Sequence, residues 1–330
     1  MFNKFKPDTF TLLLLGCVVL ATILPCQGES ATILGWATKA AITLLFFMHG
    51  AKLSREAVMG GIGAWRLHIA VSASTYILFP LLGMGIALLP STLVDDNLKA
   101  GFLFLSILPS TVQSSIAFTS MAGGNVAAAV CSASLSNIVG IALTPLLAGL
   151  LIAGAGAAQG GTMAAIQQVA LTLLLPFILG HMSRPLTAAF VHRHKALLGR
   201  LDRGSILLVV YTAFSAAVIE GLWSRVSAID LFQILVIGIL LLLLVLGLTR
   251  WVGRRAFSRA DEVVLVFCGS KKSLASGVPM AAALFPAAQV GIIILPLMLF
   301  HQIQLILCAF LARSYAQEAQ DAAALPAGSA

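Results

Sequence analysis

Two adjacent lysines, Lys271 and Lys272, lie within an apolar segment, residues 262–285, that otherwise has the pattern of a membrane-spanning helix. Insertion scales give a cost of about 3 kcal/mol for a charged side chain at the centre of a bilayer. Lys271 is eight residues beyond Val263, and at about 1.5 Å per residue this places it near the middle of a ~30 Å hydrocarbon core. Glycine, serine and proline beside the lysines also interrupt the helical pattern. These features predict a polar cavity inside a membrane protein.

The composition agrees with a membrane protein. Of the 330 residues, 59% are hydrophobic and 10% are charged, and the mean hydropathy is +1.01. A soluble globular protein has roughly 25% charged residues. We therefore predict an all-α membrane protein with ten transmembrane helices, and the lipid bilayer as its surroundings. The apolar segments lie at residues 8–25, 32–50, 67–90, 100–121, 125–152, 164–182, 204–222, 230–250, 262–285 and 289–312.

The positions of the basic residues support this number of helices. With the N-terminus in the cytoplasm, fifteen of the 20 lysines and arginines fall at the cytoplasmic side. Lys99 and Arg225 fall on the opposite side, and Lys39, Lys271 and Lys272 lie inside helices. One missed helix would invert every later loop, so this asymmetry predicts ten spans with both termini in the cytoplasm.

A Gly/Ala-rich linker at residues 153–161 divides the ten segments into two sets of five. Because each set has an odd number of spans, the second set is inverted relative to the first, as in many transporters. We predict two inverted five-helix repeats, residues 1–163 and 164–313, followed by a disordered cytoplasmic tail, residues 314–330. In such folds the matching helices of the two repeats are broken near the midplane. The fourth and ninth helices carry the most polar stretches within any span.

These two stretches and the helices beside them supply the candidate substrate-binding or ion-binding residues. Their hydroxyl and amide oxygens suit a hard cation such as Na⁺, or hydrogen bonds to a carboxylate or sulfate. Alternatively, such small polar residues let helices pack closely, an interpretation that stays open for Ser132 and Ser134. His301 acts either as a proton relay or as a hydrogen-bonding residue between helices. The candidates are Ser110, Thr111, Gln113, Ser114, Ser115, Asn125, Ser132, Ser136, Gly269, Ser270, Lys271, Lys272, Ser273, Ser276, His301 and Gln302, with Asn137 beside them.

None of the twelve carboxylates occupies a mid-membrane position. The lysines therefore have three alternative roles: they replace a bound cation as the counter-charge, they pair with an anionic substrate, or they exchange protons. The sequence contains no phosphate-cradling loop, nucleophile elbow or metal-ligand spacing. We therefore expect no enzymatic activity, no nucleic-acid partner and no cofactor other than Na⁺.

Five stretches together resemble the bile acid:sodium symporter family. They are Leu44–Arg55, Ile107–Ser114, Ala117–Asn125, Phe267–Leu274 and Leu295–Gln304. The similarity covers nearly the whole chain. Within the family it points to the SBF-like, sodium/bile acid cotransporter 7-like branch, which includes the bacterial YfeH-type proteins.

The resemblance implies a panel domain of helices 1, 2, 6 and 7 and a core domain of helices 3–5 and 8–10. Broken helices 4 and 9 would cross in the core, beside sodium sites. It places Na⁺ near Ser114, Ser115, Ser132 and Ser136. In sodium-coupled relatives the second crossing motif supplies a glutamate and a glutamine, whereas this chain has no acid from Ser270 to Leu274.

As a function, the resemblance implies sodium-coupled symport of an organic anion or related small solute across a bacterial inner membrane, by alternating access. The first alternative is a sodium-independent or proton-coupled carrier with Lys271 and Lys272 as an internal counter-charge. The second is a membrane regulator that has the same fold and does not transport.

Overall fold

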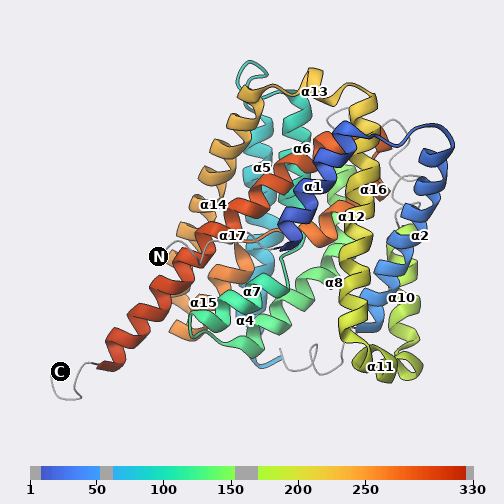
Figure 1. Ribbon diagram of the computed structural model, residues 1–330. Coiled ribbons are helices and arrows are strands. Elements are labelled where there is room, and N and C mark those ends of the chain that lie inside the picture. The colour runs from blue at the N-terminus through green and yellow to red at the C-terminus, as the bar shows by residue number, and fades with distance from the viewer. Residues whose placement is uncertain (1–8, 53–61, 153–169, 325–330) are drawn as a thin grey trace.

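The computed structural model describes residues 9–52, 62–152 and 170–324, and these residues form helices without any strand (Figure 1). The expected repeat boundary at residue 163 lies outside these residues. The helices of the first part are α1 Thr9–Ile23, α2 Gly28–Lys52, η2 Ile62–Ala64, α4 Trp65–Ala73, η3 Ser74–Leu78, α5 Phe79–Ala87, α6 Asp96–Ile107, α7 Gln113–Met121 and α8 Val126–Leu151. Those of the second part are η5 Ala170–Leu174, α10 Leu175–Met182, α11 Arg184–Arg193, α12 Lys195–Ile219, α13 Leu222–Arg225, α14 Ala228–Ala256, α15 Arg259–Gly269, α16 Leu274–Leu284 and α17 Ala287–Ala324.

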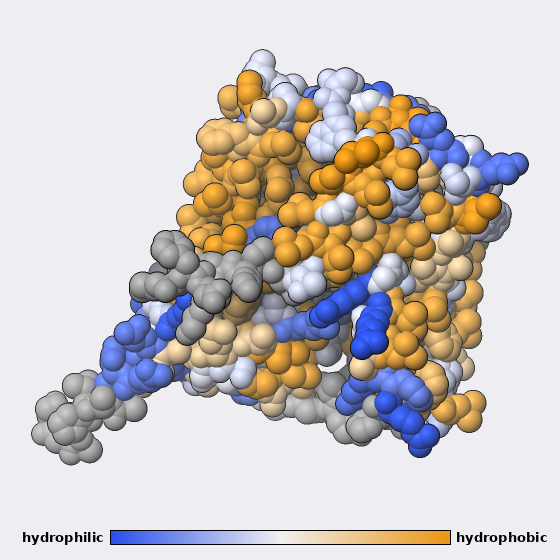
Figure 2. Space-filling model, in the orientation of Figure 1, coloured by the Kyte–Doolittle hydropathy of each residue, from blue (hydrophilic) through white to orange (hydrophobic). Residues whose placement is uncertain are grey.

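By length and composition, six of the described helices can cross a membrane. They are α2, α8, α12, α14, α17 and the run of α4, η3 and α5 from Trp65 to Ala87. A seventh candidate is the pair Leu171–Met182 and Arg184–Val191, which is bent by 85°. Figure 2 shows hydrophobic side chains over most of the visible face. The described residues therefore have the architecture of a multi-pass helical membrane protein.

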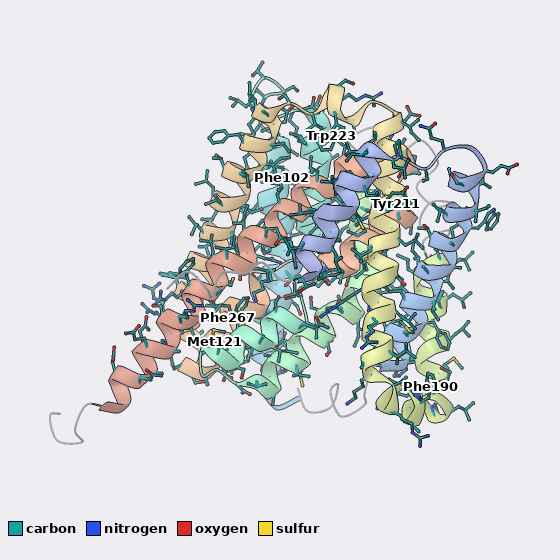
Figure 3. All side chains as sticks on the ribbon, in the orientation of Figure 1. Phe102, Met121, Phe190, Tyr211, Trp223 and Phe267 are labelled. Carbon is teal, nitrogen blue, oxygen red and sulfur yellow. The ribbon has the colours of Figure 1, made fainter. Side chains whose placement is uncertain are left out.

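Helices far apart in sequence form two groups (Figure 1). On one side, α2 packs against α10 and α12, and α1 lies along α12. Two hydrogen bonds hold the end of α1: Tyr211 Oη of α12 donates to the Leu24 carbonyl, just after α1, at 2.8 Å, and Trp223 Nε1 of α13 donates to Thr22 Oγ1 at 3.1 Å. Tyr211 and Trp223 are labelled in Figure 3. On the other side, α14 packs against α15 and α17, and α6 packs against α5 and α17. The two groups meet where α12 contacts α16 and α17.

The contact between α2 and α10 is made through two glycines. A Cβ atom at Gly50 would lie 2.0 Å from the Phe177 carbonyl oxygen, and one at Gly180 would lie 1.9 Å from the Phe47 carbonyl oxygen. Small residues let the backbones of membrane helices approach closely, which increases their van der Waals contact.

Gly50→Ala is therefore expected to lower the thermal stability of the purified protein. The added methyl group must displace the α10 backbone, and overpacking of this kind costs about 1–3 kcal/mol. Gly35→Ala on the same helix is the matched control, because a Cβ there has no other atom within 4 Å. Melting temperatures in detergent measure both effects. Equal stability of the two variants would contradict the close α2–α10 contact.

The expected disordered tail, residues 314–330, is corrected by the structure over most of its length. The helix α17 continues to Ala324, because alanine and glutamine favour helix and because two side chains in this part are anchored. Tyr315 is buried and its hydroxyl donates to a buried carboxylate at 2.6 Å. Glu318 pairs with two arginines, at 2.5 and 3.1 Å. Residues 325–330 lie outside the described part of the chain.

Candidate binding site

The first polar stretch separates α6 from α7. The helix α6 ends at Ile107, and Pro109 follows two residues later. Proline has no backbone N–H and disfavours a helical conformation in the residue before it, so the helix cannot continue. The Leu108 N–H instead donates to the Leu105 carbonyl at 3.3 Å, which tightens the last turn. Val112 precedes the start of α7 at Gln113. Backbone groups between Leu108 and Val112 therefore need partners from elsewhere.

The second polar stretch separates α15 from α16 and lies directly against the first. The Ser273 N–H donates to the Pro109 carbonyl at 2.9 Å. Ser110 Oγ donates to the Cys268 carbonyl at 2.5 Å, and Ser115 Oγ donates to the Phe267 carbonyl at 2.9 Å. The Ser273 side chain then caps α16 by accepting from the Ser276 N–H at 3.2 Å. Two interruptions more than 150 residues apart are thus joined by hydrogen bonds to their backbones.

Lys272 is completely buried, and its ammonium is held by three backbone carbonyl oxygens. Nζ donates to the carbonyls of Ser106 and Leu108 at 2.7 Å each and to that of Thr75 at 2.8 Å. The three N–H groups of an ammonium are matched by three acceptors. The backbone of Lys272 is fixed as well, because Gln304 accepts from its N–H and donates to its carbonyl, both at 2.9 Å.

The sequence explains why these three carbonyls have no backbone hydrogen bond within a helix and can accept from Lys272. In the π-helical turn η3 each N–H donates to the carbonyl five residues earlier, so the Phe79 N–H donates to the Ser74 carbonyl. In the same pattern, the N–H of the next residue would donate to the Thr75 carbonyl. That next residue is Pro80, which has no N–H. The Ser106 carbonyl would accept from Ser110 in a continuous helix, but the Ser110 N–H donates to a side chain at 3.0 Å. The Leu108 carbonyl lies beyond the end of α6.

Lys271 is equally buried but has different surroundings. Its Nζ lies 3.9 Å from the centre of the Phe118 ring and 5.4 Å from that of the Phe267 ring. No hydrogen-bond acceptor among the described residues reaches it. Phe267, labelled in Figure 3, comes from α15, and Phe118 comes from α7. The Lys272 ammonium also lies 4.2 Å from the centre of the Phe79 ring. The two ammonium groups therefore differ in their oxygens: that of Lys272 has three acceptors, whereas that of Lys271 has aromatic rings and no acceptor among the described residues.

A cavity of about 530 Å³ opens beside the two interruptions. Figure 2 shows a hollow with hydrophilic side chains beside it, between the positions of α8 and α12. Six of the predicted site residues line the cavity: Thr111, Gln113, Ser114, Ser273, Ser276 and His301. Neither Lys271 nor Lys272 is among the described residues that line it.

Asn137 on α8 joins the two interruptions at the wall of this cavity. Its Nδ2 donates to the Ser110 carbonyl at 2.9 Å, and its Oδ1 accepts from Ser276 Oγ at 2.9 Å. Ser276 Oγ also accepts from Ser273 Oγ at 3.1 Å. This chain of side chains lines the cavity with hydrogen-bonding groups whose positions are fixed by backbone contacts.

The cavity also has residues that the sequence analysis missed. Arg200, Asp202 and Arg203 of α12 and His49 of α2 line it. Asp202 forms an ion pair with Lys52, while both arginines are exposed at the rim. The three α12 residues were overlooked because the apolar segment was expected to begin at residue 204, whereas α12 begins at Lys195. With Asp202 paired, the two arginines leave the rim positively charged.

Other candidate residues have contacts away from the cavity. Ser132 Oγ lies 2.7 Å from His68 Nδ1 on α4. Asn125 caps α8 and donates to Asp261 Oδ1 at 3.0 Å. Ser270 Oγ donates back to the Val266 carbonyl within α15. The remaining ones are Gly269, whose carbonyl accepts from Ser74 Oγ at 2.7 Å, and Gln302, which lies on α17 outside the cavity lining.

The four hydroxyls predicted to hold Na⁺ do not form one donor set. Ser114 and Ser115 each share a hydrogen bond of 2.8 Å with Thr111. Ser132 instead contacts His68, and Ser136 accepts from the Ser110 N–H at 3.0 Å. A sodium ion binds several converging oxygens, and this arrangement does not fit one.

Comparison with known proteins agrees with the motifs of the two stretches. The model of the SBF-like CPA transporter family matches residues 8–317. An uncharacterized protein of Pseudomonas aeruginosa is 54% identical over 322 residues, covering 97% of this chain and 96% of its own. YfeH of Escherichia coli is 53% identical over 315 residues, which cover 95% of this chain and 94% of YfeH. Sodium/bile acid cotransporter 7-B of Xenopus laevis is 26% identical over 318 residues, covering 93% and 91%.

These matches extend over nearly the whole chain and include both interrupted stretches, so they confirm the resemblance that the motifs indicated. The matched family consists of transporters, and the described helices are those of a multi-pass membrane protein. The chain therefore belongs to the SBF-like CPA transporter family.

Proposed function

We propose that this protein is a secondary active transporter that moves a small organic anion across the bacterial inner membrane. The observation that carries the proposal is the 530 Å³ cavity beside the two joined interruptions, with fixed polar groups at its wall and two arginines at its rim. Its volume is within the range of cavities that bind small molecules, about 300–1,000 Å³. Broken helices beside a midplane cavity form the binding site in several transporter folds.

The proposed architecture has ten spans in two inverted repeats, residues 1–163 and 164–313, with both termini in the cytoplasm. The panel would comprise α1, α2, η5 with α10, and α12. The core would comprise α4 to α8 and α14 to α17, including the two broken spans α6–α7 and α15–α16. The two groups of packed helices support this division. Because the cavity lies between α12 and the interruptions, movement of the panel against the core would expose it to each side in turn.

An anion suits the charges and donors of the cavity. Arg200 and Arg203 would attract it at the cytoplasmic rim by long-range electrostatics. The Ser276 hydroxyl and both N–H groups of Asn137 already donate within the protein. The side-chain amide of Gln113 and the hydroxyl of Ser114, which also line the cavity, therefore offer the neutral hydrogen bonds. Such groups hold a carboxylate or sulfonate without a permanent ion pair, which favours its release on the opposite side.

Sodium coupling, which the names of the cotransporter 7 relatives suggest, stays a prediction. The second candidate is a sodium-independent carrier, and one observation favours it: the oxygen-rich site at the interruptions already contains the Lys272 ammonium. A cation supplied by the chain itself would offset the substrate's charge in every cycle.

Uptake into proteoliposomes tests both candidates. The probes are labelled monocarboxylates, dicarboxylates and sulfonates, and empty liposomes are the control. We expect uptake of at least one class, at equal rates with external NaCl and with choline chloride. Uptake that requires an inward sodium gradient would restore sodium coupling. Absence of uptake, together with absence of thermal stabilisation by any probe, would instead favour the membrane-regulator alternative.

A further inference from the structure

The surroundings of Lys272 have the composition of a site for a small monovalent cation. Three neutral backbone carbonyls converge on Nζ at 2.7–2.8 Å, and the side chain has no exposed surface. Hard cations such as Na⁺ prefer neutral or anionic oxygen donors of this type. Two of the oxygens come from the end of α6 and the third from the π-turn η3, whereas the ammonium comes from the other half of the chain.

We propose that Lys272 is a tethered cation that permanently fills a monovalent cation site, and that removal of its side chain uncovers a latent site for Na⁺ or a small alkylammonium ion. The inference rests on the proposed sodium-independent carrier and extends it to a named residue and a binding site. The carbonyl oxygens are freed by Pro80, by the end of α6 and by the Ser110–Ser136 bond, none of which depends on Lys272. The cage is therefore a property of the surrounding backbone, and it persists when the ammonium is removed.

The neighbouring lysine provides an internal comparison. Lys271 is buried to the same degree and both ammonium groups lie near aromatic rings, but that of Lys271 faces Phe118 and Phe267 without an oxygen acceptor among the described residues. Removal of that ammonium leaves aromatic faces and no converging oxygens. A hydrated inorganic ion gains little from such a site, because aromatic rings do not replace its water ligands.

The test is cation binding by purified Lys272→Ala, measured as a shift in melting temperature. The salts are NaCl, n-propylammonium chloride and choline chloride at equal ionic strength. The n-propylammonium ion reproduces the part of the side chain that the substitution removes, and choline is too large for the cage. We expect NaCl and n-propylammonium chloride each to raise the melting temperature of Lys272→Ala by about 5 °C relative to choline chloride. Wild type and Lys271→Ala should show no sodium-specific shift.

If Lys272→Ala does not remain folded in choline chloride, the yield of monodisperse protein extracted in each salt is the measurement. Recovery in NaCl or n-propylammonium chloride and loss in choline chloride supports the proposal. The proposal is overturned if Lys272→Ala has the same melting temperature or yield in all three salts, or if sodium stabilises Lys271→Ala to the same extent. The melting measurement does not involve transport. If uptake by the wild type requires sodium, the proposed sodium-independent carrier is refuted, whereas the proposed latent cation site is decided by the melting measurement alone.

Discussion

Lys272→Met is expected to lower the melting temperature by about 10 °C or more, whereas Lys271→Met is expected to leave it unchanged or raise it. Each buried carbonyl that loses its hydrogen bond costs about 1–3 kcal/mol, and Lys272 satisfies three of them. Lys271 satisfies none among the described residues. Replacement of a buried, unpaired charge by an apolar side chain of similar length removes a desolvation cost and loses mainly a cation–π contact.

The pair is informative because the two lysines are adjacent, equally buried and changed to the same residue. A thiol-reactive fluorophore that reports unfolding suits the measurement, since Cys268 and Cys308 are fully buried in the folded protein. Lys272→Arg serves as a further control that keeps the positive charge. Similar losses of stability in both methionine variants would show that general burial, and not the carbonyl cage, determines the contribution of these lysines.

Gly199→Trp is expected to reduce transport more than about tenfold while the protein stays folded, because it fills part of a cavity that is sized for a small solute. Gly199 lies on α12 and lines the 530 Å³ cavity. A Cβ at this position has no other atom within 4 Å, so the indole enters open space. Tryptophan also has a better helix propensity than glycine. The loss would therefore report blockage of the cavity and not damage to the fold.

Gly204→Trp is the matched control on the same helix. Its Cβ would also have no neighbour within 4 Å, but Gly204 does not line the cavity. Initial rates of uptake into proteoliposomes, normalised to the amount of folded protein, measure both variants. Unimpaired uptake by Gly199→Trp would place the transport pathway elsewhere. Equal loss in both variants would indicate a general effect of a bulky residue on α12.

Several features of the fold could be predicted because they depend on local sequence. The length of an apolar run is set by the thickness of the bilayer, so the expected segment 125–152 corresponds closely to α8, and the expected segment 230–250 lies within the longer α14. The family could be recognised from short motifs such as Ile107–Ser114 and Phe267–Leu274, and the full-length matches confirm it. The prediction of a disordered tail was wrong because its alanine-rich polar sequence is typical of disorder, whereas ion pairs with residues distant in sequence hold it as a helix.

The candidate site could be predicted only in part. Six of the expected residues line the cavity, since polar side chains inside a span must face either a cavity or one another. The α12 arginines were missed because the helix starts earlier than its apolar run. Ser132 and Asn125 contact His68 and Asp261, and their expected role in binding stays a prediction. No pattern in the sequence identifies those partners, because they lie on other helices.

The sequence by itself determined that the chain is a helical membrane protein of this transporter family with two lysines inside an apolar segment, because hydropathy and motif are properties of contiguous residues. Only the tertiary structure decided what each lysine contacts. Adjacent residues of a helix point roughly 100° apart, and the stretch from Ser270 to Ser273 is not helical. The oxygen cage also needs carbonyls released at Pro80 and at the end of α6, and three-dimensional packing is what brings those separate segments to Lys272.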